Sequence, residues 1–252
     1  MSAPGTIVAL GGGGFSMDPE PLLDDFVLSL ATRRRGVGGL PKVCFVPTAS
    51  GDAETYVDRF LEAFAGRAET ATLRLFHLHE LGGADLREHL LAQDVVYVGG
   101  GSTANLLALW RLHGLDTVLR EALEQGVVLA GVSAGMNCWF EASVTDSFGP
   151  LAPLRDGLGF LPGSACPHYD GEPDRRPAYL DLVGTGALPS GYAADDGCAL
   201  HFRDGELVEA VSSRPDAAAY RVHLAGDGLD ALDGTTAPIV AESPIDVRFL
   251  GG

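Results

Sequence analysis

The sequence has few basic side chains and no long apolar run. Lysine and arginine total 17 residues against 34 aspartate and glutamate residues, which gives a formal net charge of −17. An acidic surface repels phosphate backbones and anionic lipids, so we expect neither nucleic acid nor membrane partners. No apolar run approaches the roughly 18 residues that a membrane-spanning helix needs.

Cysteine is also scarce. The four thiols, Cys44, Cys138, Cys166 and Cys198, are widely spaced and none belongs to a C-x-x-C pair, so no disulfide framework is predicted. We interpret Cys138 and Cys166 as small buried apolar residues rather than nucleophiles. The N-terminal residues lack the basic segment and apolar stretch of a secretory signal. We therefore expect a cytoplasmic protein.

Short apolar segments alternate with segments of helical spacing through the first half of the chain. Such alternation is typical of an α/β fold, in which a parallel sheet is flanked by helices on both faces. The predicted strands are Thr6–Leu10, Lys42–Pro47, Thr72–Phe76, Asp94–Val98 and Val127–Val132. The predicted helices are Pro19–Arg33, Ala53–Phe64, Thr103–Trp110 and Thr117–Gln125.

The second half of the chain is richer in glycine, proline and aspartate. Short strands are predicted at Cys198–Phe202, Glu206–Ser212 and Ala218–His223, and Asp204-Gly205 predicts a tight hairpin turn between the first two. We find no linker, internal repeat or low-complexity tract that would divide the chain. The sequence therefore predicts a single domain over residues 1–252.

Three of the predicted strands end in loops of glycine and other small residues. These loops are Gly11–Gly14, Gly99–Gly101 and Gly131–Gly135. Ligands bind outside the carboxyl ends of parallel strands. We therefore expect the three loops to converge on one crevice.

The third loop reads Gly131-Val132-Ser133-Ala134-Gly135 and follows an apolar strand. A G-x-S-x-G pattern in that place predicts a nucleophile elbow, a sharp turn that exposes the serine hydroxyl between a strand and a helix. The turn leaves no room for a Cβ two positions before or after the serine. The alternative without catalysis is a strand-to-helix turn in which Ser133 only caps the helix.

A serine nucleophile needs a base and a group that orients the base. His168 follows Cys166-Pro167 in a loop and is the candidate base, whereas Asp196 and Asp146 are both candidates to orient it. No cysteine or acidic cluster accompanies the alternating pair His77 and His79, so no metal site is predicted.

Another glycine-rich segment, Gly99-Gly100-Gly101-Ser102-Thr103, lacks the ending of a P-loop and the spacing of a dinucleotide site. We instead predict an oxyanion hole, in which the N–H of Gly100 is paired with the N–H of Ala134.

Four motifs, Val98–Thr103, Gly131–Asn137, Cys166–Asp170 and Gly191–Leu200, occur in the order and with the residues typical of one family. Over most of the chain, the sequence resembles peptidase E, the S51 family of serine peptidases, which includes aspartyl dipeptidases and is related to cyanophycinases. The resemblance implies a flavodoxin-like, three-layer fold similar to that of the class I glutamine amidotransferases, with serine in place of their cysteine.

The same resemblance implies site residues. Ser133 takes the place of the nucleophile and His168 that of the base. Asp196 stands where the family has an acidic residue, commonly glutamate, and Asp146 is the alternative relay acid. The order serine, histidine, acid differs from that of the α/β-hydrolases.

Substrate-binding residues are also implied, with departures from the family pattern. Arg175 or Arg176 would hold the side chain of an N-terminal aspartate. Ser102 replaces an asparagine that helps to bind substrate in peptidase E.

The sequence thus predicts a serine exopeptidase that cleaves short peptides, with Asp-X dipeptides as the favoured substrates. Neither a metal nor an organic cofactor is expected. The alternatives are a hydrolase of another small amide or non-aspartyl peptide, similar to cyanophycinase, and a non-catalytic binding module on the same scaffold. The oligomeric state is left open, a homodimer included.

Overall fold

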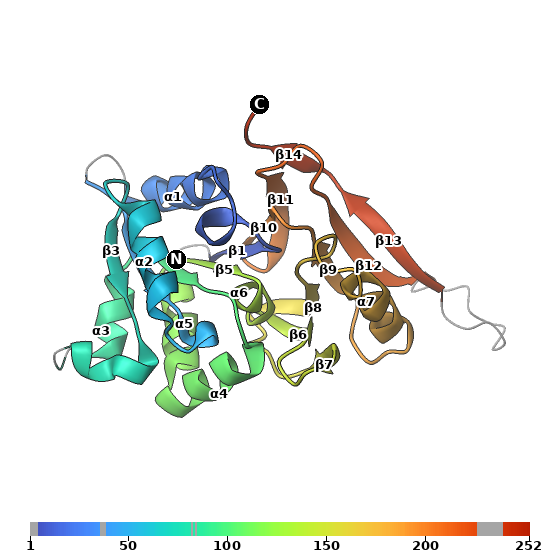
Figure 1. Ribbon diagram of the computed structural model, residues 1–252, viewed down its shortest axis with the longest axis horizontal. Helices are drawn as coiled ribbons and strands as arrows, with labels where there is room; N and C mark the ends of the chain where they lie inside the picture. The colour runs from blue at the N-terminus through green and yellow to red at the C-terminus, as the bar shows by residue number, and fades with distance from the viewer. Residues whose placement is uncertain (1–4, 36–38, 82, 84, 226–238) are drawn as a thin grey trace.

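The computed structural model describes residues 5–35, 39–81, 83, 85–225 and 239–252 of the chain. Within this part, the strands form one sheet of eight strands and another of six (Figure 1). None of the described helices has the length and apolar character needed to cross a membrane.

The larger sheet has the strand order β14-β11-β10-β1-β5-β4-β2-β3. Strands β1, β5, β4, β2 and β3 are parallel, and β10 runs antiparallel to β1. The strands of this sheet are β1 (Thr6–Leu10), β2 (Lys42–Val46), β3 (Glu69–Thr72), β4 (Val95–Val98), β5 (Val128–Val132), β10 (Cys198–Arg203), β11 (Glu206–Ser212) and β14 (Val247–Phe249).

Helices cover both faces of the parallel strands because alternate residues of each strand are buried on opposite sides. In β4, Val95 and Tyr97 pack with α1 (Leu22–Arg35) and α2 (Glu54–Phe64). Val96 and Val98 pack on the other face with α3 (Leu86–Leu91), α4 (Thr103–His113) and α5 (Leu115–Glu124). The predicted three-layer α/β arrangement is confirmed. The 3₁₀ helices are Gly14–Ser16, Thr48–Ser50 and Leu75–Leu81.

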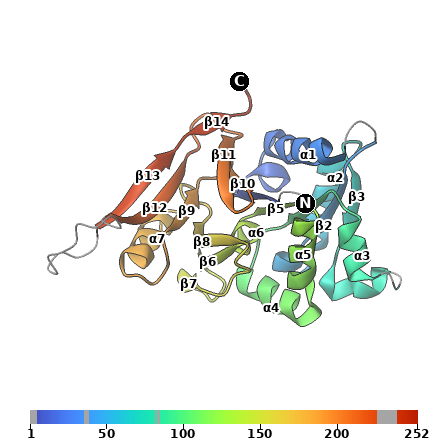
Figure 2. The same cartoon turned by 180° about the vertical axis from the view of Figure 1, so that it is seen from behind.

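The smaller sheet lies beside the larger one and carries α7 (Arg175–Gly184) on one face (Figure 2). Its strand order is β13-β12-β9-β8-β6-β7, with β6, β8 and β9 parallel. The strands are β6 (Phe140–Thr145), β7 (Ala152–Leu154), β8 (Leu161–Cys166), β9 (Gly191–Ala194), β12 (Ala219–Ala225) and β13 (Ile239–Ile245).

The predicted strand Thr72–Phe76 is wrong. The strand at this place, β3, begins at Glu69 and ends at Thr72, and the apolar residues that follow form the 3₁₀ helix Leu75–Leu81. As the terminal strand of its sheet, β3 has exposed residues and therefore no apolar run to mark it. The apolar residues beyond it were mistaken for the strand because Leu73 and Leu75 are buried.

The predicted hairpin is confirmed. β10 and β11 are antiparallel neighbours, and the turn between them places Asp204 at φ 53° and Gly205 at φ 84°. Two consecutive residues with positive φ are the requirement of a type I′ turn, which Asp-Gly satisfies. The hairpin sets β10 against β1, and β10 follows directly on the Asp196 loop.

Asp24, in the first turn of α1, carries a testable consequence for stability. Its side chain is buried beside Tyr97, and burial raises its pKa from 3.8 to about 7. The folded state therefore holds the proton more tightly than the unfolded chain, and the stability that this contributes below about pH 4 is lost as the pH rises towards 7. The difference between the pKa values of Asp24 in the folded and unfolded states lowers the free energy of unfolding by about 4 kcal/mol at alkaline pH, relative to its value below about pH 4.

We expect Asp24→Asn to raise the free energy of unfolding near pH 8 by about 2 kcal/mol, because the amide avoids the buried charge but still needs hydrogen-bond partners. Near pH 4 the gain should vanish. Urea titrations at both pH values measure the effect, with Asp25→Asn, at an exposed neighbouring position, as the control. Equal shifts for both variants would contradict the assignment.

Candidate active site

The chain turns sharply between β5 and α6 (Ala134–Asn137), and Ser133 occupies the turn. Its backbone has φ 59° and ψ −112°, a conformation that residues other than glycine adopt only under strain. A Cβ on Gly131 would overlap the carbonyl of Gly135, and a Cβ on Gly135 would overlap the carbonyl of Val98. Glycine at both positions is therefore what permits the turn, as the G-x-S-x-G pattern predicted.

Two backbone N–H groups lie near the Ser133 turn. Ala134 is the first residue of α6, so its N–H has no acceptor within that helix. A Cβ on Gly100 would contact the Ser133 side chain at 3.2 Å, so the Gly100 backbone passes directly beside the serine. In this structure the Gly100 N–H donates to the hydroxyl of Tyr56 at 3.2 Å.

His168 and Asp196 form a close pair. Nδ1 of His168 lies 2.6 Å from Oδ1 of Asp196, and the two side chains are 14% and 17% exposed. The backbone N–H of His168 donates to the carbonyl of Gly11 at 3.1 Å. A Cβ on Gly12 would overlap the Asp196 carboxylate, so the glycine loop after β1 packs directly against the pair.

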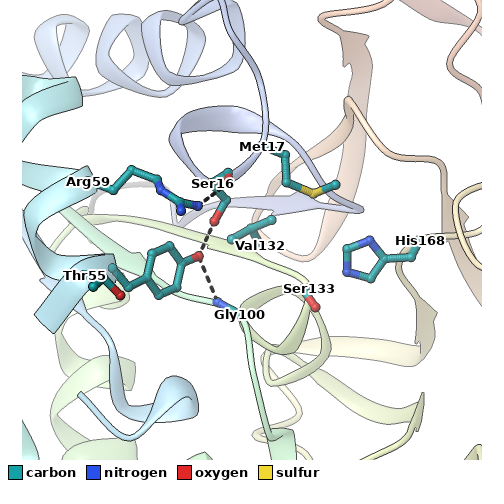
Figure 3. Close-up of a pocket in the computed structure, with 9 residues that line it drawn as sticks. Ser16, Met17, Thr55, Arg59, Gly100, Val132, Ser133 and His168 are labelled. Atoms are coloured by element: carbon teal, nitrogen blue, oxygen red, sulfur yellow. Dashed lines mark hydrogen bonds between the residues drawn. The ribbon is translucent and has the colours of Figure 1, made fainter. Parts of the chain in front are cut away.

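The contact with Asp196 sets the tautomer and the orientation of the His168 imidazole. A carboxylate at Nδ1 favours the tautomer with the proton on that nitrogen, which leaves Nε2 of His168 as an acceptor. Ser133 and His168 line one pocket of about 290 Å³, together with Gly100 and Val132 (Figure 3). This volume is near the lower limit of small-molecule sites, roughly 300 Å³, so the pocket suits a short ligand.

The expected convergence of the three glycine loops is found. The loop after β1 reaches His168 and Asp196 through Gly12, and the loop after β4 reaches Ser133 through Gly100. The loop after β5 carries Ser133 itself. All three follow the carboxyl ends of neighbouring parallel strands, β1, β5 and β4.

Asp146 is paired with an arginine rather than with His168. Its Oδ2 lies 3.9 Å from Nη2 of Arg175, whose Nε donates to Glu172 at 2.7 Å. The Arg175 side chain is 4% exposed. Neither Asp146 nor Arg175 is among the described residues that line the Ser133 pocket.

The other two expected substrate residues also have protein partners. Arg176 pairs with Glu242 at 2.9 Å, and its guanidinium lies over the rings of Tyr169 and Tyr220. The hydroxyl of Ser102 accepts from the N–H of Asn105 at 3.3 Å and so caps α4. The described lining of the Ser133 pocket includes neither Arg176 nor Ser102.

One wall of the pocket was not predicted from the sequence. Thr55, Tyr56 and Arg59 of α2 line it together with Ser16. Polar positions on an amphipathic helix are ordinarily solvated, so the sequence carried no signal that this face meets the glycine loops. Burial raises the pKa of Tyr56, which keeps its hydroxyl neutral.

The cysteines are poor candidates for a nucleophile. All four are free and buried, and burial raises the pKa values of the Cys138 and Cys166 thiols. The thiolate is the reactive form, so both are inert near neutral pH. Across the described residues, no three histidine, cysteine or acidic side chains gather as metal ligands would.

Known proteins match the chain over most of its length. A sequence profile of peptidase family S51 matches residues 7–210. The chain is 50% identical over 248 residues to the uncharacterized peptidase YgaJ of Bacillus subtilis, which is 97% of this chain and 99% of that protein. It is 29% identical over 174 residues to Peptidase E of Haemophilus influenzae, 65% of this chain and 77% of that relative. A solved peptidase from an acI-B1 Actinobacterium has the same fold, with a TM-score of 0.65 at 18% identity over 95% of both chains.

Proposed function

Since the chain belongs to peptidase family S51, as its four motifs predicted, we propose that it is a serine exopeptidase that hydrolyses short peptides. The single observation that carries this proposal is the meeting of Ser133 and His168 in one small pocket, with Asp196 bonded to the far nitrogen of the imidazole. Nucleophilic acyl transfer needs a nucleophile, a base and a group that orients the base, and these three residues are the candidates for those roles.

The first half of the reaction forms an acyl-enzyme. Ser133 Oγ attacks the peptide carbonyl while Nε2 of His168 takes its proton, and Asp196 stabilises the imidazolium. When the tetrahedral intermediate collapses, the C–N bond breaks and His168 gives the proton to the leaving amine. Water then attacks the ester with His168 as base, which releases the acid and restores Ser133.

Charge on the tetrahedral oxygen needs donors already in place. We propose the N–H groups of Ala134 and Gly100 for this role. The Ala134 N–H has no acceptor within its helix, whereas the Gly100 N–H faces the Tyr56 hydroxyl. A substrate oxygen must therefore replace Tyr56 as the acceptor of the Gly100 N–H.

We propose Asp-X dipeptides as substrates because the motifs resemble those of aspartyl dipeptidases. If Arg175 or Arg176 holds the aspartyl side chain, the substrate must compete with Glu172 or Glu242 for that arginine. Because both arginines already have glutamate partners, the alternative is favoured that another residue of the site binds the aspartyl side chain.

Rates on three dipeptides test the proposed function. We expect Asp-Leu to be hydrolysed faster than Ala-Leu and Leu-Leu, by roughly tenfold or more, because a charge-assisted hydrogen bond to the acidic side chain is lost in the other two. Release of leucine measured by chromatography gives kcat/KM for each. Equal rates would point to a broad short-peptide hydrolase, and no release from any of them would contradict the proposed function.

We propose that the protein works in the cytoplasm. Support comes from the four cysteines, all of which are free thiols. Reduced thiols are the usual state in that compartment.

A further inference from the structure

Arg59 belongs to the lining of the pocket that contains Ser133. It lies on α2 one turn after Thr55, so both side chains face the same way and line that pocket with Ser133 (Figure 3). Nη1 of Arg59 donates to the backbone carbonyl of Ser16 at 2.9 Å. This bond orients the guanidinium but leaves its positive charge uncompensated, because a carbonyl is neutral.

Arg59 lacks a carboxylate partner in an acidic chain. Other described arginines, Arg155 among them, also form no ion pair, so what distinguishes Arg59 is that it is the arginine in the described lining of this pocket. Acidic residues outnumber basic ones two to one, and arginines such as Arg111, Arg175 and Arg214 each lie within 4 Å of a carboxylate. Among the described residues, Arg59 forms no ion pair. None of the described residues that line the pocket is aspartate or glutamate either.

An uncompensated guanidinium in the lining of the Ser133 pocket creates a local field of the opposite sign to the net charge of the chain. Such a field attracts anions into a cleft and repels cations. Guanidinium groups also present N–H pairs that match the two oxygens of a carboxylate. One Arg59 nitrogen is used by Ser16, and the others are available to a ligand.

We propose that Arg59 binds a carboxylate of the peptide substrate and thereby selects short anionic peptides. The inference deepens the proposed function and rests on it. A dipeptide such as Asp-Leu offers two carboxylates, the acidic side chain and the C-terminal group, and the chemistry of recognition is the same for both. The pocket holds about 290 Å³, a volume that suits a short peptide.

Three peptides separate the two carboxylates. Asp-Leu has both, Asn-Leu lacks the acidic side chain, and the C-terminal amide of Asp-Leu lacks the terminal charge. The variant is Arg59→Gln, with Arg59→Lys to restore the charge without the planar fork. Arg87→Gln removes an equal charge from an exposed arginine that pairs with Glu121 outside the pocket, and it is the matched control.

We expect Arg59→Gln to lower kcat/KM for Asp-Leu about tenfold, mainly through a higher KM, because a charge-assisted bond to an exposed group is lost. Arg59→Lys should recover part of the loss, and Arg87→Gln should change little. The effect should disappear for the one peptide that lacks the bound carboxylate. Equal effects of Arg59→Gln on all three peptides, or an effect no larger than that of Arg87→Gln, would overturn the inference.

A binding experiment tests the role of Arg59 separately from the proposed function. Titration calorimetry with Ser133→Ala protein, with and without Arg59→Gln, measures affinity for the same peptides without any reaction. If the wild-type protein hydrolyses none of them, the proposed function fails. The inference stands in that case only if Arg59→Gln still weakens the binding of Asp-Leu about tenfold.

Discussion

Replacing Ser133 with alanine is expected to lower kcat for peptide hydrolysis by roughly 10³-fold or more, because the acyl-enzyme can no longer form. Ser190→Ala, at a serine outside the Ser133 pocket, is the matched control and should leave the rate unchanged. Leucine release from Asp-Leu measures both variants. Full activity of Ser133→Ala would contradict the assignment of the nucleophile.

The backbone of Ser133 adds a second readout to this prediction. At φ 59° and ψ −112° the serine adopts a conformation that glycine adopts without strain. For serine this conformation costs of order 1–3 kcal/mol of folding free energy. Ser133→Gly should therefore be as inactive as Ser133→Ala, yet unfold at a higher temperature than the wild type. A thermal midpoint below that of Ser133→Ala would show that the turn is not strained.

Asp196→Asn is expected to lower kcat by roughly 10³- to 10⁴-fold, because an amide at this place favours the wrong tautomer of His168. Asp146→Asn is the matched control, since it makes the same change at a carboxylate paired with Arg175. Asp146 is 58% exposed and lies 3.9 Å from an arginine that keeps its closer partner Glu172, so the control should keep its activity within a few-fold.

Steady-state rates on Asp-Leu compare the two variants directly. A large loss in Asp146→Asn with little loss in Asp196→Asn would exchange their roles. Equal large losses would mean that Asp146, through its contact with Arg175, is also needed for catalysis.

The parallel core of the fold could be predicted because its strands are buried on both faces. β1 and β4 read as unbroken apolar runs for this reason, and the glycine loops after them mark where they end. The smaller sheet could not be predicted in the same way. β8 contains Pro162 and Gly163, and β9 begins at Gly191, where a Cβ would overlap the carbonyl of Ser164. Close approach of backbones requires residues that look like loop residues in a sequence.

The site shows a similar division. The Ser133 turn could be predicted because Gly131 and Gly135 are needed by its local geometry. The choice between Asp196 and Asp146 depends on which loop reaches His168, and spacing along the chain does not contain that information. Arg59 was missed for the same reason, since only the packing of α2 against the glycine loops brings it to the pocket.

Chemical labelling tests directly whether Ser133 is the nucleophile. The protein is treated at neutral pH with a small, uncharged serine-directed acylating reagent, and the modified residue is located by mass spectrometry. We expect a single adduct on Ser133, which disappears in Ser133→Ala and is strongly reduced in His168→Ala. An unlabelled Ser133, or a label on another side chain at the same rate in all three proteins, would contradict this assignment.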